Sequence, residues 1–249
     1  GVGMNVIQTV GHGTIRREVM GEDHQRPAST DEIVRMQKLL RSAIEGGAFG
    51  MSAGLEYVPG RWSTTREMEL LAGTIAESDG VYIVHERSSG SRPMWFLPSR
   101  DAADQPSMLD NLRELMLIAD ATKVTTVATH IKARGTDFWG SSSEMNALIQ
   151  QARDDGLRFY ADQYPYNTSG TDGRIVLIPK WASELGDAEP DSEAGPDYAT
   201  RLQLVMADQA NASKLSKDIQ YEITRRGGAE SILILEHPDQ EVVGQSLAD

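Results

Sequence analysis

Short apolar runs alternate with segments of helical periodicity along the first two thirds of the chain. Between residues 31 and 45, apolar side chains recur at the three- and four-residue spacing of a helix face, and two glycines end the pattern. Ser29 or Thr30 would cap that helix. We expect helices at 31–45, 64–77, 108–121 and 143–154, and strands at 5–10, 48–55, 81–85, 124–130 and 157–164.

The strand-like runs are continuously apolar rather than alternating, which is typical of a parallel sheet covered by helices. Repeated strand–helix pairs of this size favour an α/β fold, namely a partial TIM (β/α)8 barrel. Two segments interrupt the alternation. The loop at 88–106 directly follows a strand and is either a lid or substrate wall or a solvated insertion. The stretch 186–196 is acidic and rich in proline and glycine, as exposed linkers are.

We therefore divide the chain into three parts. Residues 1–180 hold the central βα units of the barrel, 181–197 form an acidic linker or loop, and 198–249 form a helical insertion with a following strand in SILILEH.

Composition narrows the possible partners and cofactors. The 249 residues carry a net charge of −13, which argues against a nucleic-acid partner. No apolar run is long enough for a membrane span, and no signal peptide precedes the first strand, so we expect a cytoplasmic protein without a membrane partner. The chain contains no cysteine, so a metal ion would need His, Asp, Glu or a modified Lys as ligands.

Two histidines stand near the ends of apolar runs, His85 in VYIVHER and His130 in VTTVATHIK. Metal-binding and catalytic side chains gather at the carboxyl ends of parallel barrel strands. Because side chains alternate along a strand, Lys132 should share the direction of His130, and Arg87 that of His85. We expect these four side chains to converge on one mouth, although a hydrogen-bonded histidine at a strand end is the simpler alternative.

Five segments appear in a fixed order: NVIQTVGHGTIRREVMG, EGGAFGMSAGLEYVPGRWSTTREMELLA, VYIVHERSSG, THIKARGTDFWG and DQYPYNTSGT. Together they resemble the N-acyl-D-amino-acid deacylases, the D-aminoacylase branch of the amidohydrolase superfamily. The similarity covers residues 2 to about 180 and, weakly, 215–249. The resemblance implies a metal-dependent TIM barrel that hydrolyses the amide bond of N-acyl-D-amino acids to a carboxylate and a free D-amino acid, with one or two divalent ions, zinc above all.

The resemblance also implies site residues. His85 and His130 match the family's zinc-binding histidines on barrel strands five and six. Lys132 matches the lysine that reaches the substrate carboxylate, the alternative being a surface lysine. Tyr164 and Tyr166, in the YPY segment, are expected to line the substrate site, with one of them facing solvent or the core.

For two further residues the resemblance implies a less specific role. Arg87 could contact substrate or orient the loop that follows it, and an ion pair with Glu86 or Asp162 is the alternative. His12, in VGHGTIR, matches a family histidine, and we expect it to contact the metal ligands without binding the metal itself.

Other parts of the family pattern do not appear in a matching context. There is no HxH pair, no bridging ligand from a middle strand and no general-base aspartate, so no catalytic residue is identified. Ser88–Gly90 also stand where an acidic residue often follows the HxR segment. We therefore expect an internal fragment with little or no activity alone, whose partners are a small-molecule substrate and the missing barrel segments of the parent chain. The alternatives are a Schiff-base barrel lyase using Lys132 and a non-catalytic amidohydrolase-like scaffold.

Overall fold

The computed structural model describes residues 3–170, 177–184 and 198–249. The chain divides into two compact units, which we call the barrel unit and the helical unit. The barrel unit comprises Gly1–Met94, Pro106–Ala133 and Phe138–Pro165. The helical unit comprises Trp95–Gln105, Arg134–Asp137 and Tyr166–Asp249.

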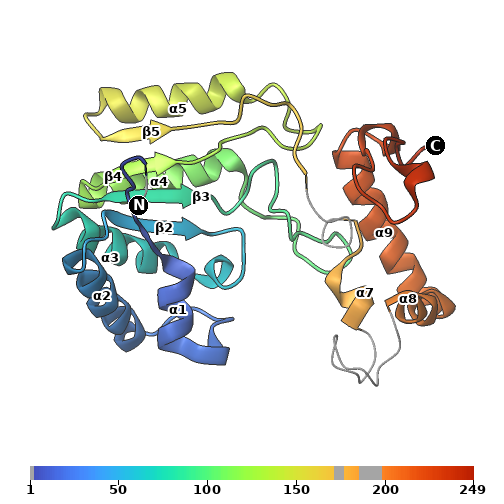
Figure 1. Ribbon diagram of the computed structural model, residues 1–249, viewed down its shortest axis with the longest axis horizontal. Helices are drawn as coiled ribbons and strands as arrows, with labels where there is room; N and C mark the ends of the chain where they lie inside the picture. The colour runs from blue at the N-terminus through green and yellow to red at the C-terminus, as the bar shows by residue number, and fades with distance from the viewer. Residues whose placement is uncertain (1–2, 171–176, 185–197) are drawn as a thin grey trace. The chain divides into compact units, whose positions relative to one another are not determined.

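The barrel unit contains a five-stranded parallel sheet in the order β1-β2-β3-β4-β5 (Figure 1). The strands are β1 (Val10–Gly11), β2 (Gly50–Gly54), β3 (Val81–His85), β4 (Thr125–Ala128) and β5 (Phe159–Ala161). The helices are α1 (His12–Met20), α2 (Thr30–Glu45), α3 (Thr65–Ala76), α4 (Met108–Thr122) and α5 (Ser142–Asp154), with short 3-10 turns at Gly21–Asp23 and Gly60–Trp62. Sequential parallel strands, each joined to the next through a helix, are the arrangement of a TIM barrel, so the predicted partial barrel is confirmed.

Local sequence signals define most of these elements. Ser29 caps α2 and forms a capping box with Glu32, in which each side chain bonds to the other's backbone N–H. Ser107 and Asp110 form the same box at the start of α4. The first strand differs from the prediction: 5–9 is not strand, and α1 begins at His12, where only the end of a strand was expected.

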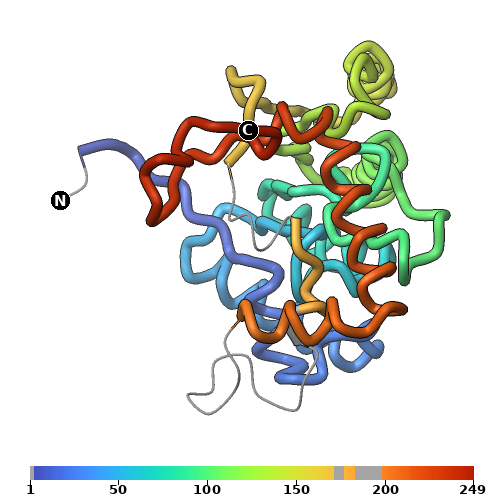
Figure 2. The backbone as a smooth tube through the Cα atoms, turned by 90° about the vertical axis from the view of Figure 1, so that its right-hand side faces the viewer, coloured from blue at the N-terminus to red at the C-terminus, as the bar shows by residue number. Residues whose placement is uncertain are grey.

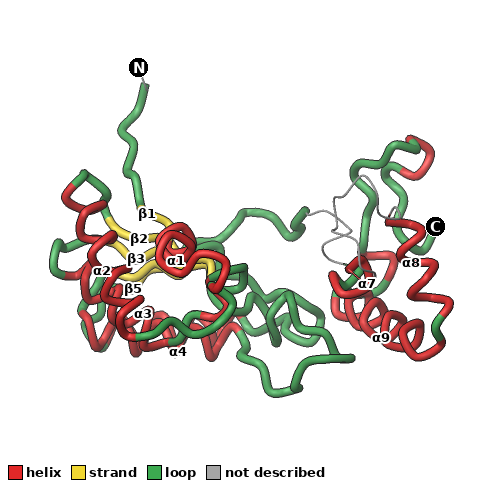
Figure 3. The backbone as a smooth tube through the Cα atoms, turned by 90° about the horizontal axis from the view of Figure 1, so that it is seen from below, coloured by secondary structure: helices red, strands yellow, loops and turns green. Residues whose placement is uncertain are grey.

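The strands bury alternate side chains, in contrast to the predicted burial on both faces. Tyr82 and Val84 of β3 are fully buried, whereas Ile83 and His85 between and beyond them are half-buried. The reason is that α2, α3 and α4 line one face of the sheet, so only the side chains directed at these helices are sealed (Figure 3). The other face carries the partly exposed side chains that are available to a ligand.

The register of the sheet brings four strand ends to one edge. Gly54 pairs with His85, and Val84 pairs with Ala128, which in turn pairs with Ala161. Residues that immediately follow these pairs therefore emerge side by side at the carboxyl edge of β2, β3, β4 and β5.

The helical unit has a small core of its own. Its helices are α7 (Lys180–Glu184), α8 (Tyr198–Ala207) and α9 (Gln209–Arg225), followed by 3-10 turns at Ala229–Ser231 and Gln240–Val242. The predicted helical segment is split into α8 and α9, which run in different directions (Figure 2). The split falls at Asp208, whose side chain accepts a bond from the Asn211 N–H and so caps α9. Val205 and Leu215 pack with Ala182 in the core.

In SILILEH the described backbone forms a single antiparallel bridge between Leu233 and Ser246 rather than a strand. Of the expected acidic linker at 181–197, residues 185–197 lie outside the described residues. No helix in the described ranges is long and apolar enough to cross a membrane.

Candidate functional site

Four side chains form a hydrogen-bonded series at the carboxyl edge of the sheet. Lys132 Nζ is 3.0 Å from His130 Nδ1, and His130 Nε2 is 2.9 Å from His85 Nδ1. On the opposite side of its ring, His85 Nε2 is 2.9 Å from Glu56 Oε2. The structure thus joins three of the four residues that the sequence predicted for one mouth, without Arg87, and it adds a carboxylate.

The lysine and the glutamate at the two ends of this hydrogen-bonded series determine which histidine nitrogens carry protons. A lysine ammonium only donates and a carboxylate only accepts hydrogen bonds. His130 therefore accepts at Nδ1 and carries its proton on Nε2, from which it donates to His85 Nδ1. His85 in turn donates from Nε2 to Glu56. All three contacts are satisfied by two neutral imidazoles.

Each histidine reaches the site by a different backbone route. His85 is the last residue of β3, and its side chain continues the half-buried face of that strand. His130 lies two residues beyond β4 in the left-handed region, with φ of 43°. Asp162 supports this turn, because its carboxylate accepts from the His130 N–H and from the Thr129 hydroxyl. Turn geometry rather than strand alternation therefore places the His130 ring.

Two tyrosine rings frame the histidines. The Tyr57 ring lies 4.5 Å from the His85 ring, centre to centre, and the Tyr164 ring lies 5.6 Å from the His130 ring. Lys132 Nζ stands 5.5 Å from the centre of the Tyr164 ring. Tyr164 thus lies beside both His130 and Lys132, and its role in lining a substrate site stays a prediction.

The local electrostatics keep His130 neutral. Burial lowers its pKa, and the positive charge of the neighbouring Lys132 lowers it further. Burial also raises the pKa of Glu86, the residue after His85, to about 8, so that this carboxyl is protonated at neutral pH. A neutral imidazole has the free lone pair that a metal ligand needs.

The pair of histidines fits a divalent metal ion. Two imidazole nitrogens on one tetrahedral zinc, at bond lengths near 2.0–2.1 Å, are separated by about 3.3 Å. His85 Nδ1 and His130 Nε2 face each other at 2.9 Å, so a displacement of about 0.4 Å would open the pair to an ion. Within the described ranges, however, no three His, Asp or Glu side chains are grouped to hold a metal, so the pair supplies only part of a ligand set.

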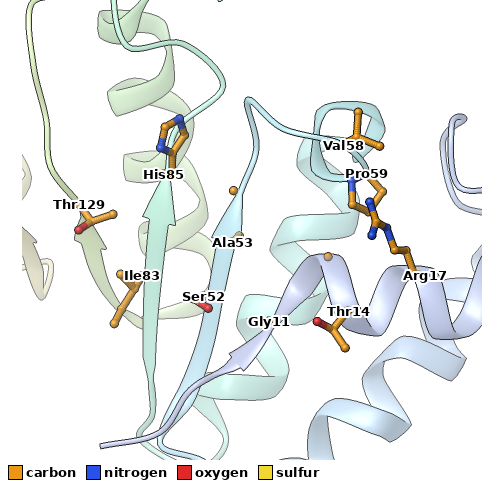
Figure 4. A pocket seen from close by; sticks show the side chains of 12 residues that line it. Gly11, Thr14, Arg17, Ser52, Ala53, Val58, Pro59, Ile83, His85 and Thr129 are labelled. Atoms are coloured by element: carbon orange, nitrogen blue, oxygen red, sulfur yellow. The ribbon is translucent and has the colours of Figure 1, made fainter. Parts of the chain in front are cut away.

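A pocket of about 480 Å³ opens beside His85 (Figure 4). It is lined by the strand face and by the start of α1, including Ser52, Ile83, Thr129 and Arg17. Its volume is within the range of small-molecule sites. The sheet therefore offers space for a small molecule next to His85.

Other residues proposed from the sequence lie in different surroundings. Arg87 forms a bidentate ion pair with Glu114 of α4, with N···O distances of 2.8 and 3.0 Å. The sequence had suggested an ion pair with Glu86 or Asp162 as the alternative to a substrate contact. His12 is buried and bonds to Glu67 rather than to either histidine of the pair. Tyr166 is 73% exposed and belongs to the helical unit. For these three the predicted roles stay predictions.

Sequence reasoning missed Glu56. This glutamate is only 2% exposed, although it follows a short strand and precedes a turn. Its carboxylate accepts from His85, from the Ser89 hydroxyl at 2.8 Å and from the Met94 N–H. Like the two histidines, Glu56 stands at the end of an apolar strand, and this position is the signal that could have identified it.

Comparison with known proteins bears on the family. No protein-family model matches the chain. The curated N-acyl-D-glutamate deacylase of Alcaligenes xylosoxydans xylosoxydans is 30% identical over 184 residues, which are 74% of this chain and 34% of that protein. The chain spans about a third of the length of the curated relatives it matches.

Two solved structures share the fold of the chain. One is an N-acyl-D-glutamate deacylase from Bordetella bronchiseptica, complexed with zinc and a phosphonate inhibitor that mimics the tetrahedral intermediate of the reaction. It has a TM-score of 0.60 and 28% identity, over 86% of this chain and 42% of that one. The other is a D-aminoacylase described as having a binuclear metal centre, with a TM-score of 0.57 and 30% identity, over 68% of this chain and 33% of that one. Motif order, strand arrangement and these similarities agree, and the chain belongs to the N-acyl-D-amino-acid deacylase family of the amidohydrolase superfamily.

Proposed function

We propose that the protein hydrolyses the amide bond of N-acyl-D-amino acids in a reaction that depends on a divalent metal ion, zinc above all. The observation that carries this proposal is the facing pair of His85 and His130, with Lys132 bonded to the second ring, at the carboxyl edge of a barrel sheet and beside a pocket. The names of the relatives support the choice of substrate class.

In this proposal His85 and His130 would hold the ion with the two nitrogens that face each other, Nδ1 and Nε2. A divalent ion at such a site polarises the substrate carbonyl and lowers the pKa of water. The lowered pKa of His130 keeps its ring neutral, and therefore able to bind, at neutral pH. The remaining ligands and the general base are not assigned to residues of this chain.

Lys132 is proposed to bind the substrate carboxylate. When His130 binds an ion through Nε2, its proton must lie on Nδ1, which then donates and no longer accepts from the ammonium. Lys132 must turn away from the ring, and a substrate carboxylate in the pocket is a suitable new partner. Tyr164, which contacts both His130 and Lys132, is proposed to line the same subsite, and Tyr166 and Arg87 remain candidates for further substrate contacts.

The test is release of free D-amino acid from N-acetyl-D-glutamate by the full-length protein, with zinc present and after chelation. We expect chelation to abolish release and added zinc to restore it. Lys132→Met should raise KM and lower kcat/KM by about 10- to 100-fold, because a charge-assisted bond of roughly 1.5–3 kcal/mol is lost.

A matched control separates this role from general charge effects. Lys123→Met removes an exposed lysine that pairs with Asp120 at the end of α4, and it should leave both constants unchanged. Release that persists after complete removal of metal would refute the proposed chemistry. Borohydride trapping of a carbonyl compound on Lys132 would instead favour a Schiff-base enzyme.

A further inference from the structure

We propose that Glu56 is a positioning residue that fixes the proton of His85 on Nε2 and thereby presents Nδ1 as a metal-binding lone pair. The inference rests on the proposed function only for the identity of the ion. The arrangement of proton, ring and carboxylate is a property of the metal-free protein.

The carboxylate of Glu56 is itself held firmly. One oxygen accepts from the backbone N–H of Met94, and the other accepts from the Ser89 hydroxyl and from His85 Nε2. The side chain is sealed from solvent, with none of its surface exposed, and lies between the loops that follow β2 and β3. Its position is therefore determined by groups outside the histidine pair.

The direction of the bond to His85 follows from the chemistry of the partners. An ionised carboxylate has no proton to give, so His85 must donate from Nε2, and a neutral ring then has its lone pair on Nδ1. That nitrogen faces His130 Nε2. Carboxylates that accept from the outer nitrogen of a metal-binding histidine fix its tautomer and orientation, and their loss typically weakens metal affinity by about 10- to 100-fold.

Glu56 acts through His85 in this arrangement and not as a ligand. It contacts Nε2, whereas the other histidine faces Nδ1 on the opposite edge of the ring. An ion held between the two rings would lie on the side of His85 that faces away from the Glu56 carboxylate.

The decisive variant is Glu56→Gln, which keeps the shape of the side chain. The Met94 N–H can only donate, so it retains the amide oxygen, and the amide nitrogen then faces Ser89 and His85. The Ser89 hydroxyl can rotate to accept, but the ring must now accept at Nε2 and carry its proton on Nδ1. The substitution is therefore expected to switch the tautomer of His85 and to block the nitrogen that faces His130.

Two measurements test this. The first is the ¹⁵N NMR shifts of the His85 ring in the metal-free protein, identified by their loss in His85→Gln. We expect the Nε2–H form in the wild type and the Nδ1–H form in Glu56→Gln. The second is zinc affinity by competition with a chromophoric chelator, which should fall about 10- to 100-fold in Glu56→Gln.

The control variant is Glu77→Gln, which alters an exposed ion pair with Arg41 and no bond to a histidine. It should leave both the His85 tautomer and the zinc affinity unchanged. An Nδ1–H form in the wild-type protein would overturn the inference without any need for a variant, and so would a Glu56→Gln protein that keeps its zinc affinity within twofold. Zinc binding without release of D-amino acid would refute only the proposed function.

Discussion

The barrel unit contains two pairs of histidine and glutamate with the same bond but different surroundings. His12 Nε2 and Glu67 Oε1 are 2.9 Å apart, as are His85 Nε2 and Glu56 Oε2. Both members of the first pair are completely buried, and Arg16 donates to the second oxygen of Glu67. The His12–Glu67 pair is therefore part of a buried cluster that joins α1 to α3, and we call it the closed pair.

The His85–Glu56 pair has one side that is not sealed, and we call it the open pair. His85 is half-buried, and its second nitrogen faces another imidazole beside a pocket. The corresponding nitrogen of His12 is buried and has no hydrogen-bond partner among the described residues. A carboxylate bonded to a histidine is thus not sufficient for a site. The His85–Glu56 pair differs because the other ring nitrogen of His85 directs its lone pair at His130, a group with which it can share a ligand. Substitutions in the two pairs test this difference.

The largest expected effect is on stability at the closed pair. Glu67→Gln leaves the Arg16 guanidinium buried opposite a neutral amide, and removal of one partner from a buried ion pair costs about 3–5 kcal/mol. We expect the free energy of unfolding, measured by urea denaturation, to fall by that amount. Glu56→Gln should cost less, about 1–3 kcal/mol, because the ring that Glu56 accepts from, His85, is a neutral hydrogen-bond donor. Equal losses in the two variants would remove the distinction between the pairs.

The closed pair should also control stability in acid. Burial by itself would raise the pKa of Glu67, but the hydrogen bonds and charges of His12 and Arg16 outweigh it, and the pKa lies below the ordinary 4.5. Because the folded pKa is depressed, the ionised carboxylate stabilises the fold above pH 4.5, and this stabilisation is lost as the pH falls through the folded value.

The comparison is made between the wild type and Glu67→Gln over the range from pH 6 downwards. The unfolding free energy of the wild type should decrease more steeply below pH 4.5 than that of the variant, which lacks the titrating group. Parallel curves would show that Glu67 does not titrate differently in the folded and unfolded chain.

Much of the fold could be predicted because periodicity and capping are local. The predicted bounds of β3 agree with the structure, and those of α2, α3 and α4 agree within one residue. The helix α1 was missed because its first turn contains Gly13 and follows Gly11, a pattern that indicates a break. What stabilises it is tertiary, since Arg16 on this helix reaches Glu67 of α3.

The site was only partly accessible from the sequence. His85, His130 and Lys132 were found because strand ends of a barrel carry its chemistry. The bond of His85 to Glu56 requires knowledge of the register, in which Gly54 stands opposite His85. The position of Glu56 after an apolar strand marks it as a candidate but does not show which side chain it will bond to, and nothing in Ser88–Gly90 shows that Ser89 will donate to it.

The smallest expected effect concerns this serine. Ser89→Ala removes one of the donors to Glu56, while the Met94 N–H and His85 keep the carboxylate in place. A buried hydrogen bond of this kind contributes about 0.5–1.5 kcal/mol to stability. The tautomer of His85 should not change, because the group opposite Nε2 is still a carboxylate.

Zinc affinity should accordingly fall by much less in Ser89→Ala than in Glu56→Gln. The matched control is Ser63→Ala, which removes another buried hydroxyl bond, the one to the Gly60 carbonyl, and should cost similar stability with no change in zinc affinity. If Ser89→Ala weakened zinc binding as strongly as Glu56→Gln, the position of the carboxylate rather than its inability to donate a proton would control His85. The open pair would then depend on packing in the same way as the closed one.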